Sequence, residues 1–554
     1  MFRLILKKAG ICFLFLFLIQ EAFPQTKGEY VIVFADKPRM ENYHPSSFLS
    51  QRALERRQRY RIPLTEEDYP VDSLYINSIL QSDNSIGLLS KSKWMNYIVV
   101  SCDTLLLDNM RQLPFVKQIS SLHTVHYEEL LPERHFTETV PHFTATIPTT
   151  NNDEQVDTEW YGVMYPQIKR HNGHLLHHAG YKGEGMLIAL LDCGFYGLHT
   201  LPAFEDMLNE NRLLYHHDFV KEGFDMFTNN NHGMCVLSTM ASHVAGVAVG
   251  TAPYADYVIL KTEAVSYENI REEYFLVEGL ECADSIGADV VNISLGYTVF
   301  NDGNTNHTFA SLDGLHSVAS MAVSLSIEKG MVVSAAAGNE GERDWKYIGM
   351  PGDAYNVLCV AAVNSQGEVA NFSSRGSSLF RRRQPNIASV GWQTFIQQNN
   401  ESFSAGNGTS FASPVNAGLA ACLRQAFPQK TSHEIIRAIL QSCNHVTLPD
   451  TLTGYGIPDY WQAYRILEAS NLVKKELQII YPNPVQSTLT IKAYYPNRLF
   501  RVEMIDIMGR PLFSSSYEGN DCISLDISSL PGGIYVLKIH SDEGIAVKRI
   551  SKLN

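Results

Sequence analysis

Four short apolar runs recur between positions 159 and 469 of this 554-residue chain, and helical patterns alternate with them. The runs are 186–191, 257–260, 290–293 and 331–335. In each run apolar residues follow one another almost directly, so a strand formed by it would be buried on both faces. Such strands belong in a parallel sheet that helices cover on each side. We therefore expect a three-layer α/β domain with a mostly parallel sheet over residues 155–470.

The chain is too long for one compact domain, and the sequence before the apolar runs has a different character. Strand candidates at Tyr30–Phe34 and Tyr97–Ser101 and a basic, helical stretch at Ser46–Tyr60 predict a small α/β unit. From Leu131 to Asp157 the chain is rich in Thr, Pro, Asn and Glu without periodicity, which is typical of an exposed linker. We assign the unit and its linker to residues 26–150.

The last part of the chain, residues 475–554, changes character again. Short runs that alternate apolar and polar residues occur at 487–493, 500–507 and 534–539, and Pro and Gly turns separate them. Alternation of this kind is typical of strands with one buried face. It predicts a small all-β sandwich domain.

The first residues indicate export. Arg3, Lys7 and Lys8 precede the apolar run 11–19, and polar residues follow at once. A charged start, a short apolar segment and a polar exit are typical of a signal peptide, here residues 1–25. The alternative, a membrane anchor, needs roughly 20 apolar residues, more than this run has. No later run is long and apolar enough to span a bilayer, so we expect a secreted or cell-surface protein.

Charge and cysteine content exclude several classes of function. The formal net charge is −14 and no long basic run is present, which argues against nucleic acid as a partner. The nine cysteines are scattered without C-x-x-C pairs, so neither a zinc site nor a dense disulfide framework is indicated. We expect no metal and no other cofactor, although calcium sites leave no signature that can be read here.

Three local patterns in the large domain carry the residues that nucleophilic hydrolysis needs. Asp192 follows an apolar run at the carboxyl end of a predicted strand, where the active sites of open α/β sheets collect. His232 begins a helical run, and a ring in the first turn can project into a cleft. Ser410 lies at the start of another helical pattern, with Pro414 expected in its first turn and the positive helix end beside it.

Each pattern alone is weak evidence, because an Asp can cap a helix, a His-Gly pair is usually a loop and Gly-Thr-Ser is usually a turn. Their order along the chain is more specific. The order Asp, His, Ser is that of subtilisin, whereas chymotrypsin has His, Asp, Ser and the α/β-hydrolases have Ser, Asp, His. The α/β-hydrolases are also excluded because their Gly-x-Ser-x-Gly pattern does not surround Ser410.

With these motifs the sequence resembles the subtilase family over roughly Tyr161 to Ala469. The segments that carry the resemblance are Ile188–Gly194, His232–Gly233, Gly250–Pro253, Asn292–Gly296, Ala336–Gly341, Phe372–Gly376 and Gly408–Pro414. Two positions depart from the family pattern: Cys193 stands where Ser or Thr is usual, and Met234–Cys235 where Thr-His is usual. We interpret Cys193 and Cys235 as buried thiols that leave activity intact.

The resemblance implies the catalytic roles. Asp192, His232 and Ser410 would form a triad in which the serine attacks, the histidine carries the proton and the aspartate orients the imidazole. Asn339 would bind the oxyanion together with the Ser410 backbone N–H.

The resemblance also implies where a substrate binds. An edge to which an extended chain can add is expected at Ser294, Leu295 and Gly296. Space for the side chain that precedes the cut is expected at Ala336, Ala337 and Gly338. No acidic residue is predicted to face that pocket.

The flanking regions resemble known companions of such enzymes. The amino-terminal unit is similar to a subtilase propeptide, which implies an inactive zymogen with its own propeptide as a partner. The carboxyl-terminal unit, with 481–484, 530–535 and a basic tail, resembles the sorting domain of the type IX secretion system of Bacteroidota. The secretion machinery is then a second partner. The alternative is a β-sandwich that binds carbohydrate or protects the protease.

Two functions from different classes follow. One is a secreted serine endopeptidase that acts on protein or peptide substrates. The other is a catalytically silent subtilase-like protein retained for surface binding. A silent relative would normally lack the Ser, the His or the oxyanion Asn, whereas all three are present here, which favours the enzyme.

Overall fold

A computed structural model describes residues 27–122, 136, 154–221, 223–303, 305–379, 382–476, 479–492, 499–518, 523–541 and 544–554. The predicted signal peptide and most of the predicted linker lie outside these residues. The chain divides into two compact units, Met1–Tyr464 and Arg465–Asn554. None of the helices in the described ranges has the length and apolar character needed to cross a membrane.

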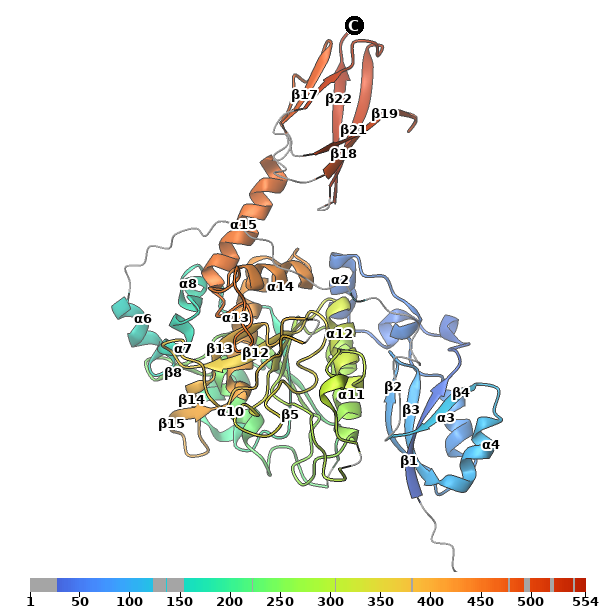
Figure 1. The fold of residues 1–554 in the computed structure, drawn as a ribbon, viewed down its shortest axis with the longest axis vertical. Coiled ribbons are helices and arrows are strands. Elements are labelled where there is room, and N and C mark those ends of the chain that lie inside the picture. Colours follow the sequence, from blue (N-terminus) through green and yellow to red (C-terminus); the bar gives the residue numbers. More distant parts are fainter. Residues whose placement is uncertain are drawn as a thin grey trace, which may run out of the picture. The chain divides into compact units, whose positions relative to one another are not determined.

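The larger unit contains a seven-stranded sheet in which every pairing is parallel (Figure 1). Its spatial order is β13-β12-β11-β10-β5-β9-β6. The strands are β5 (Leu187–Asp192), β6 (Leu213–Asp218), β9 (Asp256–Lys261), β10 (Val290–Ile293), β11 (Val332–Ala336), β12 (Leu358–Val363) and β13 (Ile387–Val390). Every residue of β5, β10, β11, β12 and β13 is buried, which explains their continuous apolar sequences. The prediction of a mostly parallel sheet is confirmed.

Helices cover both faces of this sheet (Figure 1). α10 (His232–Ala241) and α13 (Thr409–Ala426) contact each other on one face, and α13 crosses β10 to β13. α11 (Arg271–Ile286) and α12 (Val318–Glu328) contact each other on the opposite face. α14 (Ser432–Gln441) contacts both α12 and α13, and α15 spans Tyr460–Glu476. The result is the three-layer arrangement that the apolar runs predicted.

Residues 27–122 form a four-stranded antiparallel sheet with three helices. The strand order is β2-β3-β1-β4. The elements are β1 (Lys27–Phe34), α2 (Gln51–Tyr60), α3 (Ser73–Leu80), β2 (Gly87–Ser92), β3 (Tyr97–Asp103), α4 (Leu107–Arg111) and β4 (Val116–Ser121). The predicted helix begins later than Ser46, because Ser50 caps it by accepting a hydrogen bond from the Ala53 N–H at 3.1 Å. The predicted linker also ends earlier than Asp157, since α6 (Glu154–Tyr161) begins at Glu154.

The basic stretch on α2 is an interface with the parallel-sheet domain. Arg56 hydrogen-bonds to Asp284 on α11, and Arg57 donates to Asp284 Oδ2 at 2.8 Å and to Asp68 Oδ1 at 2.9 Å. The side chains of Arg56, Arg57 and Asp284 are at most 3% exposed. Nearby, Tyr97 of β3 packs edge-on against Tyr274 of α11 with ring centroids 5.7 Å apart. Because the charges of Arg56, Arg57 and Asp284 are removed from water, each is stable there only with its oppositely charged partner.

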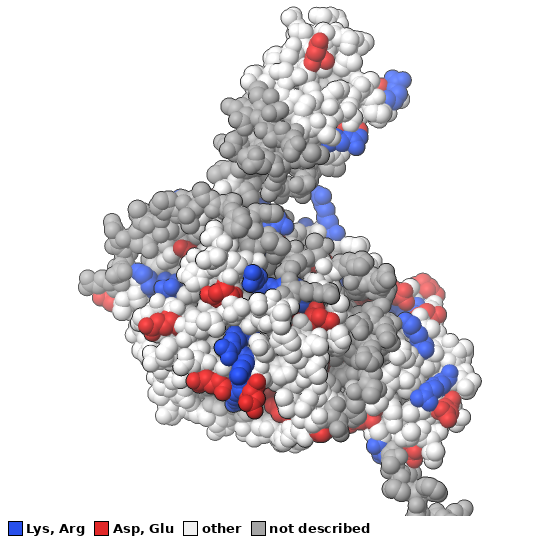
Figure 2. Space-filling model, viewed as in Figure 1, with Lys and Arg blue, Asp and Glu red and all other residues white. Residues whose placement is uncertain are grey.

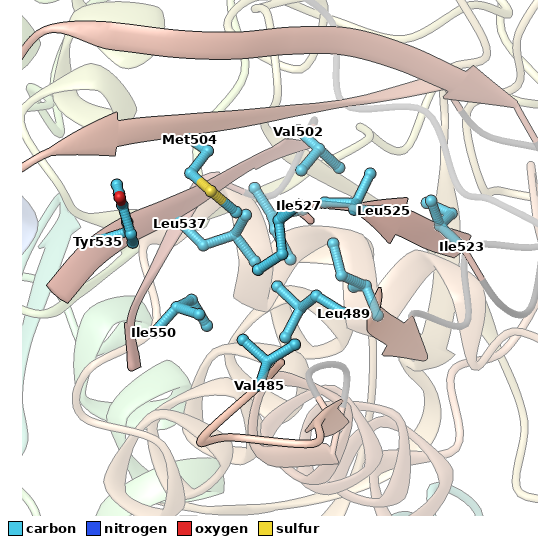
Figure 3. Close-up of a cluster of buried hydrophobic side chains, with 12 residues drawn as sticks. Val485, Leu489, Val502, Met504, Ile523, Leu525, Ile527, Tyr535, Leu537 and Ile550 are labelled. Carbon is cyan, nitrogen blue, oxygen red and sulfur yellow. The ribbon is translucent and has the colours of Figure 1, made fainter. Parts of the chain in front are cut away.

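The smaller unit consists of two antiparallel sheets, with strand orders β16-β17-β20 and β19-β18-β21-β22. Its strands are β16 (Ile479–Tyr481), β17 (Thr488–Lys492), β18 (Leu499–Asp506), β19 (Pro511–Glu518), β20 (Ile523–Asp526), β21 (Gly533–Ser541) and β22 (Gly544–Lys552). Figure 3 shows side chains of both sheets, such as Leu489 and Leu537, directed into one apolar core. Alternate residues of a strand, such as Val502 and Met504, enter this core. The predicted small all-β sandwich is confirmed.

Charged side chains are dispersed over the one face of the molecule that Figure 2 shows. Figure 2 shows acidic and basic residues on one face of the molecule in small groups, with wide uncharged areas between them. The net charge of −14 is therefore not gathered into one acidic patch among the described residues of this face.

Candidate active site

Asp192, His232 and Ser410 come together at the carboxyl edge of the parallel sheet. Asp192 is the last residue of β5, His232 the first of α10 and Ser410 the second of α13. The carboxyl ends of parallel strands lie at one edge, so the strand end and the two helix starts share a single cleft.

Two glycines explain why the chain segments that carry Asp192 and His232 can lie so close. The Gly233 N–H donates to the Gly194 carbonyl at 2.9 Å. A Cβ added to Gly233 would lie 2.7 Å from that same carbonyl oxygen, and one added to Gly194 would lie 2.8 Å from the Asn230 carbonyl oxygen. The glycines that follow the Asp and the His in the sequence motifs are thus required by close backbone approach.

Asp192 and His232 form a hydrogen-bonded pair. Asp192 Oδ1 lies 2.8 Å from His232 Nδ1, with the carboxylate fully buried and the imidazole 33% exposed. The Cys193 backbone N–H also donates to Asp192 Oδ1, at 2.8 Å. Burial alone would lower the pKa of His232, but the charge and hydrogen bond of Asp192 outweigh burial and hold this pKa above its ordinary value. The arrangement fixes the ring and leaves Nε2 for a second partner.

Ser410 is joined to Ser294 by two hydrogen bonds. Ser410 Oγ donates to the Ser294 carbonyl at 3.2 Å, and Ser294 Oγ donates to the Ser410 carbonyl at 2.8 Å. The second bond has a local cause in Pro414. We predicted Pro414 in the first turn of its helix, but it is the sixth residue of α13 and lies inside it. Proline has no N–H for the carbonyl four residues earlier, so Ser294 supplies the hydrogen that the helix lacks.

Asn339 is oriented by Thr409. Its Oδ1 accepts hydrogen bonds from the Thr409 backbone N–H at 2.9 Å and from Thr409 Oγ1 at 3.1 Å. A Cβ added to Gly408 would lie 3.8 Å from Asn339 Nδ2 and 3.6 Å from the Ser410 backbone nitrogen. Two N–H donors therefore border one small space beside Ser410. Such a pair can stabilise a negatively charged oxygen.

A cleft of about 360 Å³ connects these groups. The predicted residues that line it are His232, Ser294, Leu295, Gly296, Ala336, Gly338, Asn339 and Ser410. Asp192 and Ala337 are fully buried and do not line it. Gly338 has φ +107°, and an added Cβ there would lie 2.8 Å from Ser374 Oγ, so this position needs glycine.

Several lining residues were missed by the sequence analysis, among them two acids. The prediction that no acidic residue faces the pocket at Ala336–Gly338 concerned one part of the site only, and elsewhere along the cleft Glu263 and Glu340 both line it. Glu340 is paired with Arg343, whose Nη1 lies 3.1 Å from Glu340 Oε1. Glu263 follows the end of β9 by two residues, and β9 is the neighbour of β5. An acid just beyond a predicted buried strand was a signal that could have identified it. The other lining residues that were not predicted as part of the site are Cys193, Asn230, Thr298, Arg343, Gly349 and Thr409.

The cysteines near the triad are free, buried thiols, as interpreted from the sequence. Burial, followed by the charge of Asp192, raises the pKa of Cys235 to about 12, and the same two causes raise the pKa of Cys193 still further. Ligand atoms of Asp192, Cys193 and His232 lie within 4.8 Å of one another. However, the Asp and His atoms in this group are hydrogen-bonded to each other. The closeness of the three residues is therefore explained by the hydrogen bond between Asp192 and His232, without a metal ion.

Comparisons with known proteins identify three parts of the chain. Residues 183–456 match the Subtilase family, residues 29–135 the Peptidase S8 propeptide domain of Bacteroidota, and residues 479–552 the Secretion system C-terminal sorting domain. Subtilisin of Bacillus pumilus is 31% identical over 282 residues, which cover 50% of this chain and 88% of that protein.

Two further relatives and one solved structure are similar. Subtilisin E of Bacillus subtilis (strain 168) is 30% identical over 282 residues, 50% of this chain and 63% of that protein. M-protease of Shouchella clausii (strain KSM-K16) is 26% identical over 412 residues, 74% of this chain and 90% of that protein. The structure of the Prenylagaramide maturation protease PagA aligns at 21% identity with a TM-score of 0.42, covering 53% of this chain and 98% of that one.

Proposed function

The chain belongs to the subtilase family, and from that premise we propose that Asp192, His232 and Ser410 are its catalytic triad and that Asn339 binds the oxyanion. The protein is a serine-type endopeptidase, made with a propeptide and exported to the cell surface or the medium through a type IX sorting domain. The observation that carries the proposal is the 2.8 Å hydrogen bond between Asp192 and His232 in the cleft that also contains Ser410 and Asn339.

In the proposed reaction, Ser410 Oγ leaves the Ser294 carbonyl and turns toward His232 Nε2. It attacks the carbonyl carbon of the scissile peptide while His232 takes its proton. The negative charge of Asp192 stabilises the imidazolium that forms. His232 then gives the proton to the departing amine, which leaves an acyl-enzyme. A water molecule, deprotonated by the same imidazole, releases the acid product. Among the described residues no hydrogen bond joins Ser410 Oγ to His232, and such bonds often tighten only when substrate is bound.

Substrate binding is proposed along the line Ser294, Leu295 and Gly296. Gly296 is exposed, and an extended chain can add to this edge as a strand. Asn339 Nδ2 and the Ser410 N–H would then face the carbonyl oxygen as it becomes negative. The small residues Ala336 and Gly338 leave room for the side chain that precedes the cut, with Ala337 supporting this floor from below.

We further propose that residues 26–150 are removed on activation, that 155–470 is the mature protease and that 475–554 is the sorting domain. Of the described residues 27–122, none lines the cleft, and their contacts are with α11 and its surroundings. We propose that residues 26–150 assist folding of the parallel sheet, which is slow because its contacts are distant in sequence, and that the segment also keeps the zymogen inactive as an inhibitor-like propeptide. Amino-terminal sequencing of the active enzyme tests the processing. A start near Glu159 is expected, and an active enzyme that begins near Thr26 contradicts it.

A fluorophosphonate probe tests the nucleophile. The mature wild-type enzyme should be labelled on Ser410, whereas Ser410→Ala and a heat-denatured sample should not be labelled. Cys193→Ser is the matched control, because this residue lines the same cleft but carries no proposed catalytic step. Labelling of the Ser410→Ala variant at another residue would disprove the assignment.

A further inference from the structure

Glu263 lies in the active-site cleft on the side opposite to Ala336 and Gly338. The sheet order β11-β10-β5-β9 arranges the residues that follow these strands in the same sequence across the cleft. Ala336 and Gly338 come first, then Ser294 to Gly296, then Cys193, and last Glu263. Glu263 thus borders the cleft beyond the triad, with its side chain partly exposed.

The carboxylate of Glu263 has no hydrogen bond and no ion-pair partner within the described ranges. Three other acidic residues, Glu272, Glu273 and Glu340, differ in this respect. Glu272 accepts hydrogen bonds from the Ala264 N–H at 2.7 Å and the Asn269 N–H at 2.9 Å. Glu273 is bonded to Ser317 at 2.6 Å, and Glu340 to Arg343 at 3.1 Å. Unlike these three residues, Glu263 lines the cleft with a carboxylate that is still able to bind a group entering it.

The nearby charges that act most strongly on the pKa of Glu263 are negative. Burial raises its pKa most, and the charges of Glu272, Glu268 and Asp192 raise it further. The closest cation in sequence, Lys261, is already engaged, with its Nζ 3.7 Å from Asp218 and 4.9 Å from the ring centroid of Phe224. A positive charge brought to this point would favour the ionised form of Glu263 and would be stabilised by it and by the neighbouring acids.

We infer that Glu263 is a specificity-determining residue that binds a Lys or Arg side chain at the second substrate position before the scissile bond. This inference rests on the proposed use of the cleft. Side chains of an extended substrate alternate between two sides. If the residue that precedes the cut faces Ala336 and Gly338, the residue before it faces the opposite side, where Glu263 lies beside Cys193 and His232. A long basic side chain matches an unpaired carboxylate there through a charge-assisted hydrogen bond.

The test uses mature enzyme and quenched peptides that differ only at the second position before the cut, which is Lys, Met or Glu. The wild type should cleave the Lys peptide with a kcat/KM roughly 10- to 100-fold above that for the Met peptide. Glu263→Gln should bring the two peptides within about twofold by lowering the Lys value alone. Glu268→Gln is the matched control, since it removes a charge from the same group outside the cleft lining, and it should keep the preference.

A second variant, Glu263→Arg, should reverse the order and favour the Glu peptide, which keeps the test decisive if the Gln variant folds poorly. Equal cleavage of the three peptides by a wild-type enzyme that the fluorophosphonate probe labels normally overturns this inference alone. An equal fall of the Lys and Met values in Glu263→Gln also overturns it, because Glu263 would then act on the triad and not on the substrate. Absence of both labelling and cleavage overturns the proposed function, and this inference with it.

Discussion

Ser294 and Ser410 are linked in both directions: the Ser410 hydroxyl donates to the Ser294 carbonyl, and the Ser294 hydroxyl donates to the Ser410 carbonyl. The pair ties the chain beyond β10 to the first turn of α13. It also holds the Ser410 hydroxyl, the proposed nucleophile, in a resting position that does not depend on a hydrogen bond to His232. The reason is Pro414, which leaves the Ser410 carbonyl without its usual helical partner.

The first prediction concerns this pair. Ser294→Ala leaves the Ser410 carbonyl without a donor and should destabilise the protein by about 1–3 kcal/mol. Pro414→Ala restores a backbone N–H at that position, so in the Ser294→Ala background it should recover part of the loss. Unfolding curves of the four combinations give the coupling free energy, with Ser410→Ala in every variant to prevent self-digestion. Additive effects would show that the Ser410 carbonyl does not link the two positions.

The proposed catalytic roles predict two different kinetic losses. Ser410→Ala should reduce peptide hydrolysis to background, because the attacking atom is gone. Asn339→Ala removes one of two oxyanion donors and should lower kcat by about 10²–10³-fold, the size of effect known for such a donor in subtilisin. KM should change little, since the interaction forms in the transition state. Steady-state kinetics on one peptide decide this, and normal turnover by Ser410→Ala would refute the mechanism.

The pH dependence should reflect the raised pKa of His232. The proposed base must be neutral to accept a proton, and Asp192 holds its pKa above the ordinary value of about 6.5. Activity should therefore be lost as pH falls through a value above 6.5. In Asp192→Asn the charge is gone, so burial dominates and this acidic limb should move to lower pH, while kcat falls by about 10⁴-fold. A profile of kcat/KM against pH for both enzymes measures the shift, and an unmoved limb would assign it to another group.

The buried ion pairs on α2 should stabilise the zymogen. Arg56→Met leaves Asp284 with Arg57 as its remaining partner in this cluster and should cost up to about 3–5 kcal/mol. Arg59→Met is the matched control, because Arg59 is exposed on the same helix, and it should change stability by less than about 0.5 kcal/mol. Thermal unfolding of the full-length Ser410→Ala protein compares them. Equal midpoints for the two variants would show that the Arg56 pair contributes little.

Removal of residues 477–554 should separate export from activity. The smaller unit has its own apolar core, so its deletion should leave a folded protease that the fluorophosphonate probe still labels. The truncated protein should remain in the periplasm of the native host. Immunoblots of periplasm and medium, with full-length protein beside them, locate it. Normal amounts of truncated protein in the medium would show that these residues are dispensable for sorting.

Local sequence patterns predicted the buried strands and the site motifs, because both depend on residues that are close together in the sequence. Continuous apolar runs identified β5, β9, β10 and β11, because burial on both faces leaves a direct trace in the sequence. The Asp, His and Ser motifs identified residues that the fold brings to one edge, and chain order distinguished this fold from others that use the same residues.

Features that depend on distant pairing were not predictable. Arg56 and Asp284 are 228 positions apart, and nothing in a basic helix reveals that it will be buried against an acid. Glu263 became interpretable only when β9 was known to lie beside β5. The position of Pro414 within α13 depended on where the helix begins, a boundary that periodicity defines poorly.

The free thiols have a consequence for the life of the protein outside the cytosol. Seven cysteines are unpaired in the described residues, and burial raises their pKa values, to about 11 for Cys282 and about 12 for Cys235. Thiol oxidants react with the thiolate, so these seven thiols should react slowly with them in the folded protein. The unfolded chain has no such protection when it enters an oxidising compartment. Rapid folding therefore protects the cysteines from oxidation. Any segment of the chain that speeds folding also limits incorrect disulfide formation before secretion is complete.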